Sequence, residues 1–123
     1  MIKMIFCLKR LPQFSRDEFQ RYWREQHAPL VKRHVAALSV RRYVQSHTIS
    51  DPRLEMVSAA RGSAGLEFDG VAELWWDSLE SLMSAVSTEA GQVAGRELLE
   101  DEGRFIDLPN SPVFFTQEVE VVG

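Results

Sequence analysis

Cysteine and long hydrophobic runs are almost absent from this chain. Its single cysteine, Cys7, cannot form an intramolecular disulfide, which excludes a disulfide-stapled scaffold and favours a reducing cytoplasm. Cys7 lies in an alternating apolar run, so we expect a small buried side chain there and not a nucleophile. No stretch approaches the roughly 20 apolar residues of a membrane span, and we expect neither a signal peptide nor a membrane partner.

Clustered positive charge is also missing. The 14 Lys and Arg residues are outnumbered by 18 Asp and Glu residues, which gives a net charge of −4 with no basic block. The sequence therefore predicts no positively charged surface for a nucleic-acid phosphate backbone, and we expect no nucleic-acid partner. The sequence likewise has no glycine-rich phosphate loop, no GxSxG motif and no dinucleotide fingerprint. These absences argue against nucleotide cofactors and serine hydrolase chemistry, and we expect no cofactor.

The pattern of apolar residues predicts one α+β domain over residues 1–123. Alternation with period two predicts four strands, at residues 2–8, 39–48, 70–76 and 113–121. One helix follows the first strand. One broken helix or two short ones, interrupted at Gly91 and Gly95, follow the third. This order is the split βαβ arrangement of a ferredoxin-like sandwich, with an antiparallel four-stranded sheet and two main helices on one face.

The helix-free face of such a sheet would present an apolar and aromatic surface to water. We expect Ile5, Tyr43, Trp75 and Phe114 on that face. A continuous patch of this kind is characteristic of an interaction surface. Burial against a second copy would cover it, so the sequence predicts a homodimer that forms a dimeric α+β barrel.

The first helix carries the strongest local signals in the chain. Ser15 and Glu18 have the spacing of a capping box at its start. Pro29 lacks an N–H group and pushes Ala28 away from helical geometry, so we expect the helix to kink or restart beside His27. His27 is then either a titratable site group, oriented by the freed backbone groups, or a histidine packed at a helix end.

Further polar candidates come from two of the predicted strands. Period two places Tyr43, Gln45 and His47 on one face of the second strand, and Glu73 beside Trp75 on one face of the third. On a cavity face, burial would let Glu73 share a proton with a histidine. The alternative for Glu73 is an ion pair with Arg41 or another cation at the dimer seam.

Histidine and acidic clusters elsewhere have simpler interpretations. His27, His34 and His47 can be drawn as a metal site, but Pro29 disturbs the helix and no HExxH or cysteine cluster supports the site, so we expect no metal. The acidic residues within 97–102 predict a solvated helix face. The connection at 50–65 is longer than usual, which predicts a lid or a mobile segment.

Taken together, several segments resemble the EthD-domain family of the dimeric α+β barrel superfamily, almost from end to end. The matching segments are Ile2-Lys3-Met4, residues 19–30 with Tyr22-Trp23 and His27-Ala28-Pro29-Leu30, Arg42-Tyr43-Val44-Gln45 with His47, residues 69–75, and Asp101-Glu102 through Phe105-Ile106-Asp107. In related lactone isomerases, the resemblance implies, histidines and a tyrosine in the barrel cavity handle the substrate. Their nearest matches here are His27, His47 and Tyr43.

The residues and the resemblance lead to one main functional hypothesis. We expect a cofactor-free enzyme, of the oxidoreductase, isomerase, cyclase or decarboxylase type, that acts on a small hydrophobic aromatic or lactone bound in the barrel cavity. The predicted catalytic residues are His27, His47 and Tyr43, and the predicted substrate-binding residues are Trp23, Gln45, Glu73 and Trp75.

Two other hypotheses remain open at the level of sequence. One is a non-catalytic small-molecule binding or accessory protein of a catabolic or polyketide pathway. The other is a haem-binding barrel, for which a histidine ligand is available but no other feature is diagnostic. Turnover by the purified protein and a haem titration, respectively, separate these from the main hypothesis.

Overall fold

A computed structural model describes residues 1–63 and 67–123. The elements are β1 (Ile2–Leu8), α1 (Arg16–Tyr22), η1 (Trp23–His27), α2 (Ala28–His34), β2 (Arg42–His47), η2 (Pro52–Leu54), α3 (Glu55–Ala59), β3 (Gly70–Trp76), α4 (Leu79–Ser87), α5 (Glu89–Glu102), η3 (Leu108–Asn110) and β4 (Val113–Thr116).

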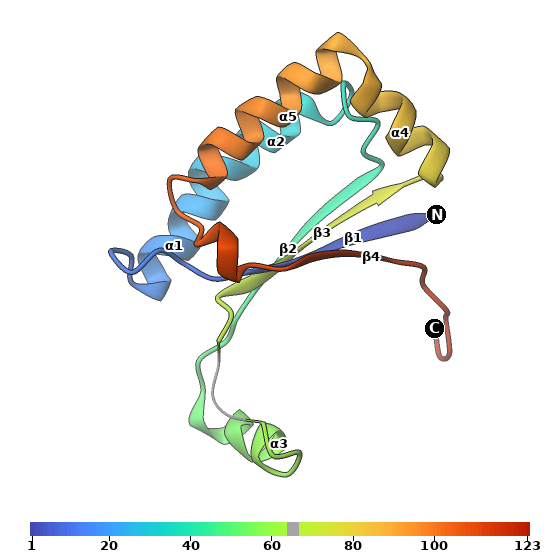
Figure 1. Cartoon of the computed structure of the whole chain (residues 1–123). Coiled ribbons are helices and arrows are strands. Elements are labelled where there is room, and N and C mark those ends of the chain that lie inside the picture. Colours follow the sequence, from blue (N-terminus) through green and yellow to red (C-terminus); the bar gives the residue numbers. More distant parts are fainter. Residues whose placement is uncertain (64–66) are drawn as a thin grey trace.

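The four strands form one sheet in the order β2-β3-β1-β4, and every neighbouring pair is antiparallel. The helical segments α1, α2, α4 and α5 all lie on one face of this sheet (Figure 1). The predicted α+β, ferredoxin-like arrangement is therefore confirmed. The alternation in β1 explains which face is covered, because Phe6 and Leu8 point toward the helices and are buried.

Aromatic side chains fill the space between the first helix and the sheet. Phe19, Trp23 and Phe105 are almost completely buried. The ring centroid of Phe19 lies 5.3 Å from that of Phe105 and 5.9 Å from that of Trp23. Such tilted pairs stabilise a core beyond the area that they bury. The packing of this cluster sets the distance between the first helix and the sheet.

The first helix begins as predicted, and its α-helical pattern is interrupted beside His27 as predicted, although the chain stays helical throughout. Ser15 and Glu18 form the capping box, with each side chain bonded to the other residue's backbone N–H. Ala28 is helical, so the predicted displacement before Pro29 is wrong. The chain instead makes a π-helical turn, η1, in which the Ala28 N–H donates to the carbonyl of Trp23, five residues earlier. This wider turn accommodates Pro29 at the second position of α2, where no intrahelical N–H is needed.

The second helical region also differs from the prediction in detail. It forms two helices, but α5 is a full-length helix and not a short one. The break falls at Thr88, whose hydroxyl accepts a hydrogen bond from the Gly91 N–H at 2.9 Å and caps α5. Gly91 and Gly95 lie inside α5 and do not interrupt it.

Two strands are shorter than predicted. β4 ends at Thr116, which pairs with Lys3 near the start of β1, so little of β1 remains for a longer strand to pair with. β2 begins only at Arg42, because the chain first turns through Ser39, which has a positive φ of 57°. Part of the predicted lid at 50–65 forms η2 and α3, which project away from the sheet and the other helices (Figure 1). Residues 64 and 65 lie outside the described residues.

The helix-free face of the sheet is only partly apolar. Phe114 is 49% exposed there, next to Ile5 on β1. Trp75 is 6% exposed, because Lys3 and Arg42 lie over its ring and its Nε1–H donates to Glu118 at 2.5 Å. Tyr43 was predicted for this face and is on the other one, because it pairs with Leu74, not Trp75.

No helix in the described part of the chain is both long enough and apolar enough to cross a membrane.

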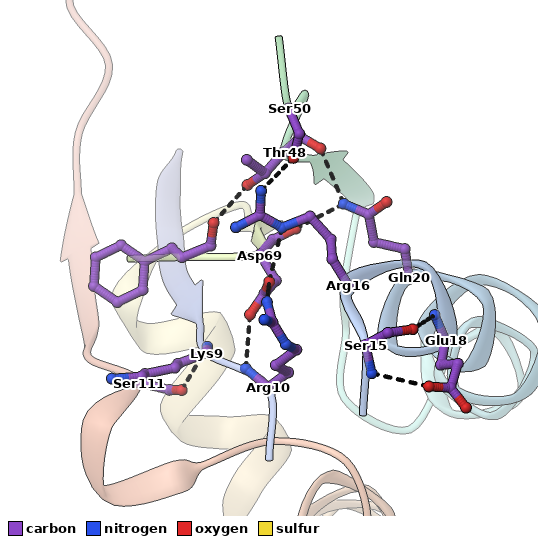
Figure 2. Close-up of polar contacts among 11 residues, drawn as sticks. Lys9, Arg10, Ser15, Arg16, Glu18, Gln20, Thr48, Ser50, Asp69 and Ser111 are labelled. Atoms are coloured by element: carbon purple, nitrogen blue, oxygen red, sulfur yellow. Dashed lines mark hydrogen bonds and ion pairs between the residues drawn. The ribbon is translucent and has the colours of Figure 1, made fainter. Parts of the chain in front are cut away.

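A buried aspartate ties the N-terminal end of β3 to its neighbours. Asp69 is 1% exposed. Its carboxylate accepts hydrogen bonds from the Arg10 backbone N–H at 2.8 Å, from the Arg10 guanidinium and from Arg16 Nε at 2.9 Å (Figure 2). Its carbonyl accepts from the Gln20 side chain and from the Thr48 N–H. One residue thereby joins the end of β1, α1 and the end of β2.

Replacing Asp69 should cost stability in a pH-dependent way. Burial acts to raise the pKa of Asp69, but hydrogen bonds from Arg16 and Arg10 outweigh it and leave the pKa below its usual value. A lowered folded-state pKa contributes stability that is present at neutral pH and is lost as the pH falls below about 4. We expect Asp69→Asn to lower the free energy of unfolding by about 2–3 kcal/mol at pH 7 and by much less at pH 3.

Chemical denaturation at the two pH values measures this difference. Asp77→Asn is the control, because Asp77 forms an exposed ion pair with Arg41, at 3.4 Å. Equal effects of the two substitutions at pH 7 would contradict the role assigned to Asp69.

Candidate functional site

A cavity of about 300 Å³ lies between the helices and the sheet. Its wall is almost entirely apolar, with Phe6, Leu74 and Leu98 among the lining residues. Only His27, Tyr43 and Glu102 contribute titratable side chains from the described residues that line it. A concave, apolar space with a few converging polar groups is the usual form of a small-molecule site.

His27 is held at this cavity by a buried carboxylate. It lies at the end of η1, is 5% exposed, and its Nδ1 is 2.7 Å from Asp101 Oδ2 on α5. The other carboxylate oxygen accepts from Tyr22 Oη at 2.6 Å and from Arg104 Nη1 at 3.0 Å. Asp101 is thus an acceptor with three donors, and its bond to Nδ1 leaves Nε2 as the ring nitrogen available to a bound molecule.

The electrostatics of this pair favour a neutral histidine and a charged aspartate. Burial lowers the pKa of His27, although its hydrogen bond and charge interaction with Asp101 act in the opposite direction. Burial acts to raise the pKa of Asp101, but the hydrogen bonds from Tyr22, His27 and Arg104 outweigh it and lower that pKa overall. At neutral pH His27 therefore offers an unprotonated Nε2, which can accept a proton.

Tyr43 supplies a hydroxyl group to the same cavity. Its Oη accepts a hydrogen bond from Gln45 Nε2 at 2.8 Å, and the same amide nitrogen donates to the carbonyl of Trp23 at 2.9 Å. Burial raises the pKa of Tyr43 to about 12, so the phenol stays protonated. Since its oxygen is already an acceptor, its own O–H is free to donate to a molecule in the cavity.

His47 does not line the cavity. Its Nε2 is 2.9 Å from Gln45 Oε1, and its ring is 4.6 Å from the ring of Trp23, centroid to centroid. Its Nδ1 is the one buried side-chain polar atom in the described part of the chain that has no hydrogen-bond partner. The sequence placed His47 on the same strand face as Tyr43 and Gln45, but it could not show that His47 lies at the far end of β2, beyond Gln45.

Glu73 and Trp75 lie on the opposite face of the sheet from His27 and Tyr43. Leu74 lines the cavity, so its two neighbours on β3 must point away from it. The shared cavity predicted for all the candidates is therefore wrong for these two. Glu73 instead forms an ion pair with Lys3 at 2.8 Å, which is the alternative interpretation of that carboxylate.

Two functional candidates were missed by the sequence interpretation. Asp101 and Glu102 were expected on a solvated helix face, and that prediction is wrong for both because Asp101 is buried and Glu102 lines the cavity. Burial, together with the nearby charge of Asp101, raises the pKa of Glu102 to about 7. Helical spacing was the available signal, because Glu102 follows the apolar Leu98 by four residues.

The third histidine belongs to a separate surface contact. His34 Nε2 is 2.6 Å from Glu97 Oε2. Within residues 1–63 and 67–123, no three His, Cys, Asp or Glu side chains gather as potential metal ligands.

Comparison with known proteins gives consistent matches to one family. The sequence profile of the EthD domain matches residues 11–109. No curated protein matches the chain. An EthD family protein from Bacillus halodurans superposes with a TM-score of 0.62 at 19% identity, over 97% of this chain and 100% of that one.

Two further solved structures have the same fold. An EthD-like protein from Ralstonia eutropha has a TM-score of 0.61 at 16% identity, over 98% of this chain and 95% of that one. A protein from Bacteroides fragilis, described as dimeric with a ferredoxin-like fold, has a TM-score of 0.58 at 11% identity, over 95% of both chains.

Removing the Glu102 carboxyl should stabilise the protein at neutral pH. A folded-state pKa of about 7 lies above the unfolded value, so the wild type loses stability as the pH rises from about 4.5 to 7. Glu102→Gln lacks this penalty, and we expect it to exceed the wild type by up to about 3 kcal/mol at pH 8 and to differ little at pH 4.

Urea denaturation across this pH range checks the difference. Glu100→Gln is the control, because Glu100 is two residues earlier on α5 and its side chain is exposed. A parallel pH dependence for the wild type and Glu102→Gln would show that Glu102 titrates normally.

Proposed function

Because the chain belongs to the EthD domain family, with residues 11–109 matching its profile, we propose that it is a cofactor-free enzyme of this family. It binds a small hydrophobic aromatic or lactone in the cavity between helices and sheet, and His27 transfers a proton to or from that molecule. The overall reaction is of the oxidoreductase, isomerase, cyclase or decarboxylase type. The observation that carries this proposal is the buried His27–Asp101 pair beside an apolar cavity.

Each polar group has a distinct part in this proposal. Asp101 fixes the tautomer and the orientation of the His27 ring, so that Nε2 acts as the general base. Tyr43 donates a hydrogen bond to an oxygen of the substrate. Trp23 forms part of the cavity wall, and Gln45 positions the Tyr43 hydroxyl from behind. The apolar wall excludes water, which strengthens each of these interactions.

His47 takes a positioning part in this scheme, through Gln45, in place of direct proton transfer. Glu73 and Trp75 belong to the other face of the sheet, where we propose that a second copy packs to form a homodimer. The half-exposed Phe114 beside Ile5 and the dimeric relative from Bacteroides fragilis support that assembly. The single Cys7 favours a cytoplasmic location.

A second candidate function is a non-catalytic binding or accessory protein of a catabolic or polyketide pathway. The nearly complete apolar lining of the cavity favours it, because such a wall also suits a carrier of a hydrophobic metabolite. Both the enzyme and the binding protein would bind the small molecule, but only the enzyme would convert it.

The first experiment screens hydroxylated aromatics, quinones and lactones for a rise in unfolding temperature and for chemical conversion by mass spectrometry. For a converted compound, we expect His27→Gln to lower turnover by about 10²-fold or more while binding is retained, since proton transfer is lost. His34→Gln is the matched control, because His34 pairs with Glu97 outside the cavity and should leave turnover unchanged. Unchanged turnover in His27→Gln would refute the mechanism, and binding without conversion of any compound would favour the carrier.

A second variant tests whether the ligand occupies this cavity. Gly95 lines the cavity, and a Cβ at this position would have no heavy atom within 4 Å, so a larger side chain can fill the space without a clash at its base. We expect Gly95→Leu to fold with an equal or higher unfolding temperature, because leucine also favours the helix. The ligand-induced rise in unfolding temperature should disappear.

The neighbouring substitution Arg96→Leu is the control. Arg96 is exposed on the same helix and does not line the cavity, so this variant should respond to ligand as the wild type does. A full ligand response in Gly95→Leu would place the binding site elsewhere.

A further inference from the structure

Glu102 contributes a carboxyl group to the wall of the apolar cavity. Gly95, Leu98, Leu99 and Glu102 follow one another at helical spacing and together form the part of α5 that lines the cavity. Neither a hydrogen bond nor an ion pair to the Glu102 side chain is present in the described part of the chain. The nearest arginine in sequence, Arg104, is bonded to Asp101 and Glu100 instead.

Glu102 is half-buried, and at an apolar cavity wall an unpaired carboxylate is disfavoured relative to the neutral acid. Burying a charge without a partner costs far more than burying a hydroxyl that can form a hydrogen bond. The neutral acid has one O–H donor. In the cavity this O–H can donate a hydrogen bond to an acceptor on a bound molecule. Glu102 thus favours a ligand that carries a hydrogen-bond acceptor, in addition to one whose shape fits the cavity.

We infer that Glu102 is the specificity-determining residue of the cavity. As a neutral carboxyl it donates a hydrogen bond to an oxygen of the ligand, and when ionised it repels anions. The ligand class is therefore a small neutral aromatic or alicyclic molecule with a carbonyl oxygen, and not a carboxylic acid. This inference rests on the proposed function for the location of the ligand, but it concerns binding and not turnover.

Three other titratable groups face Glu102 from the elements around it. Asp101 is beside it on α5 and is held as a carboxylate by its three donors. His27, from η1, has a pKa lowered by burial, and Tyr43, from β2, has one raised to about 12. The pKa of His27 is shifted below this range and that of Tyr43 lies above it, so Glu102, with a pKa of about 7, is the one of these groups whose pKa falls between pH 6.5 and pH 8.5.

The test uses acetophenone and benzoate, which have similar size and shape but differ in charge. Isothermal titration calorimetry gives their dissociation constants for the wild type, Glu102→Gln and Glu100→Gln at pH 6.5 and pH 8.5. Between these values the neutral fraction of a group with a pKa of about 7 falls from about three-quarters to about 3 per cent, so acetophenone should bind the wild type about 25-fold more weakly at the higher pH.

The two variants separate the carboxyl group from general charge effects. The Glu102→Gln amide is a permanent neutral donor, so its affinity for acetophenone should be nearly the same at both pH values. Its affinity for benzoate at pH 8.5 should exceed that of the wild type by about tenfold or more, because the repulsion between like charges is gone. Glu100→Gln removes an exposed charge from the same helix and should behave as the wild type.

Several results would overturn the inference. They are a pH-independent affinity of the wild type for acetophenone, equal benzoate affinity in the wild type and Glu102→Gln, and no acetophenone binding at pH 6.5. Loss of turnover in His27→Gln has no bearing on these measurements. A pH-dependent affinity without any turnover would support the inference while refuting the catalytic part of the proposed function.

Discussion

The arrangement of the helices above the sheet depends on the hydrogen bonds that the buried carboxylate of Asp101 accepts. The carboxylate accepts hydrogen bonds from Tyr22 on α1, His27 on η1 and Arg104 just after α5. Two segments that are far apart in sequence, the first helical region with Tyr22 and His27 and the C-terminal end of α5 with Arg104, are thereby held at one point. Because a buried charge is tolerated only when its hydrogen bonds are satisfied, these segments cannot shift independently. The cavity is the space that remains beneath this fixed junction.

The two faces of the sheet are different environments, and successive side chains of one strand point to opposite faces. On β3, Leu74 faces the cavity while Glu73 and Trp75 face the other side. Polar groups on the cavity side are few and each has a defined donor or acceptor role. Those on the other side form an ion pair between Lys3 and Glu73 and cover the ring of Trp75. In the proposed function, ligand contacts and subunit contacts therefore use different side chains of β3.

Sequence patterns predicted the fold because the strands and the first helix carry local signals that agree with one another. The capping box at Ser15 and the alternation in β1 depend on neighbouring residues alone. Much of the site depends on distant contacts. The contact between Asp101 and His27 spans 74 residues, and nothing local distinguishes Asp101 from the exposed Glu100 beside it.

Other differences between prediction and structure have equally specific causes. His47 and Tyr43 share a strand face, but only the folded chain shows that Trp23 lies against one of them and leaves the other open to the cavity. The faces of β3 were predicted correctly, yet the face that borders the cavity is decided by which side the helices cover. Gly91 and Gly95 weaken a helix by propensity, but tertiary packing of Ala94 and Leu98 keeps α5 continuous.

The π-helical turn has a consequence for how such a site arises in evolution. A π turn holds one residue more than the α-helix around it, and the flanking helices keep their buried faces, represented by Phe19 and Val31. The gain of a single codon in an ordinary helix is enough to produce the bulge from which His27 reaches Asp101. Loss of that codon, together with replacement of Pro29, would return the helix to regular geometry. Relatives with the same architecture can thus acquire or abandon this histidine position without rebuilding the fold.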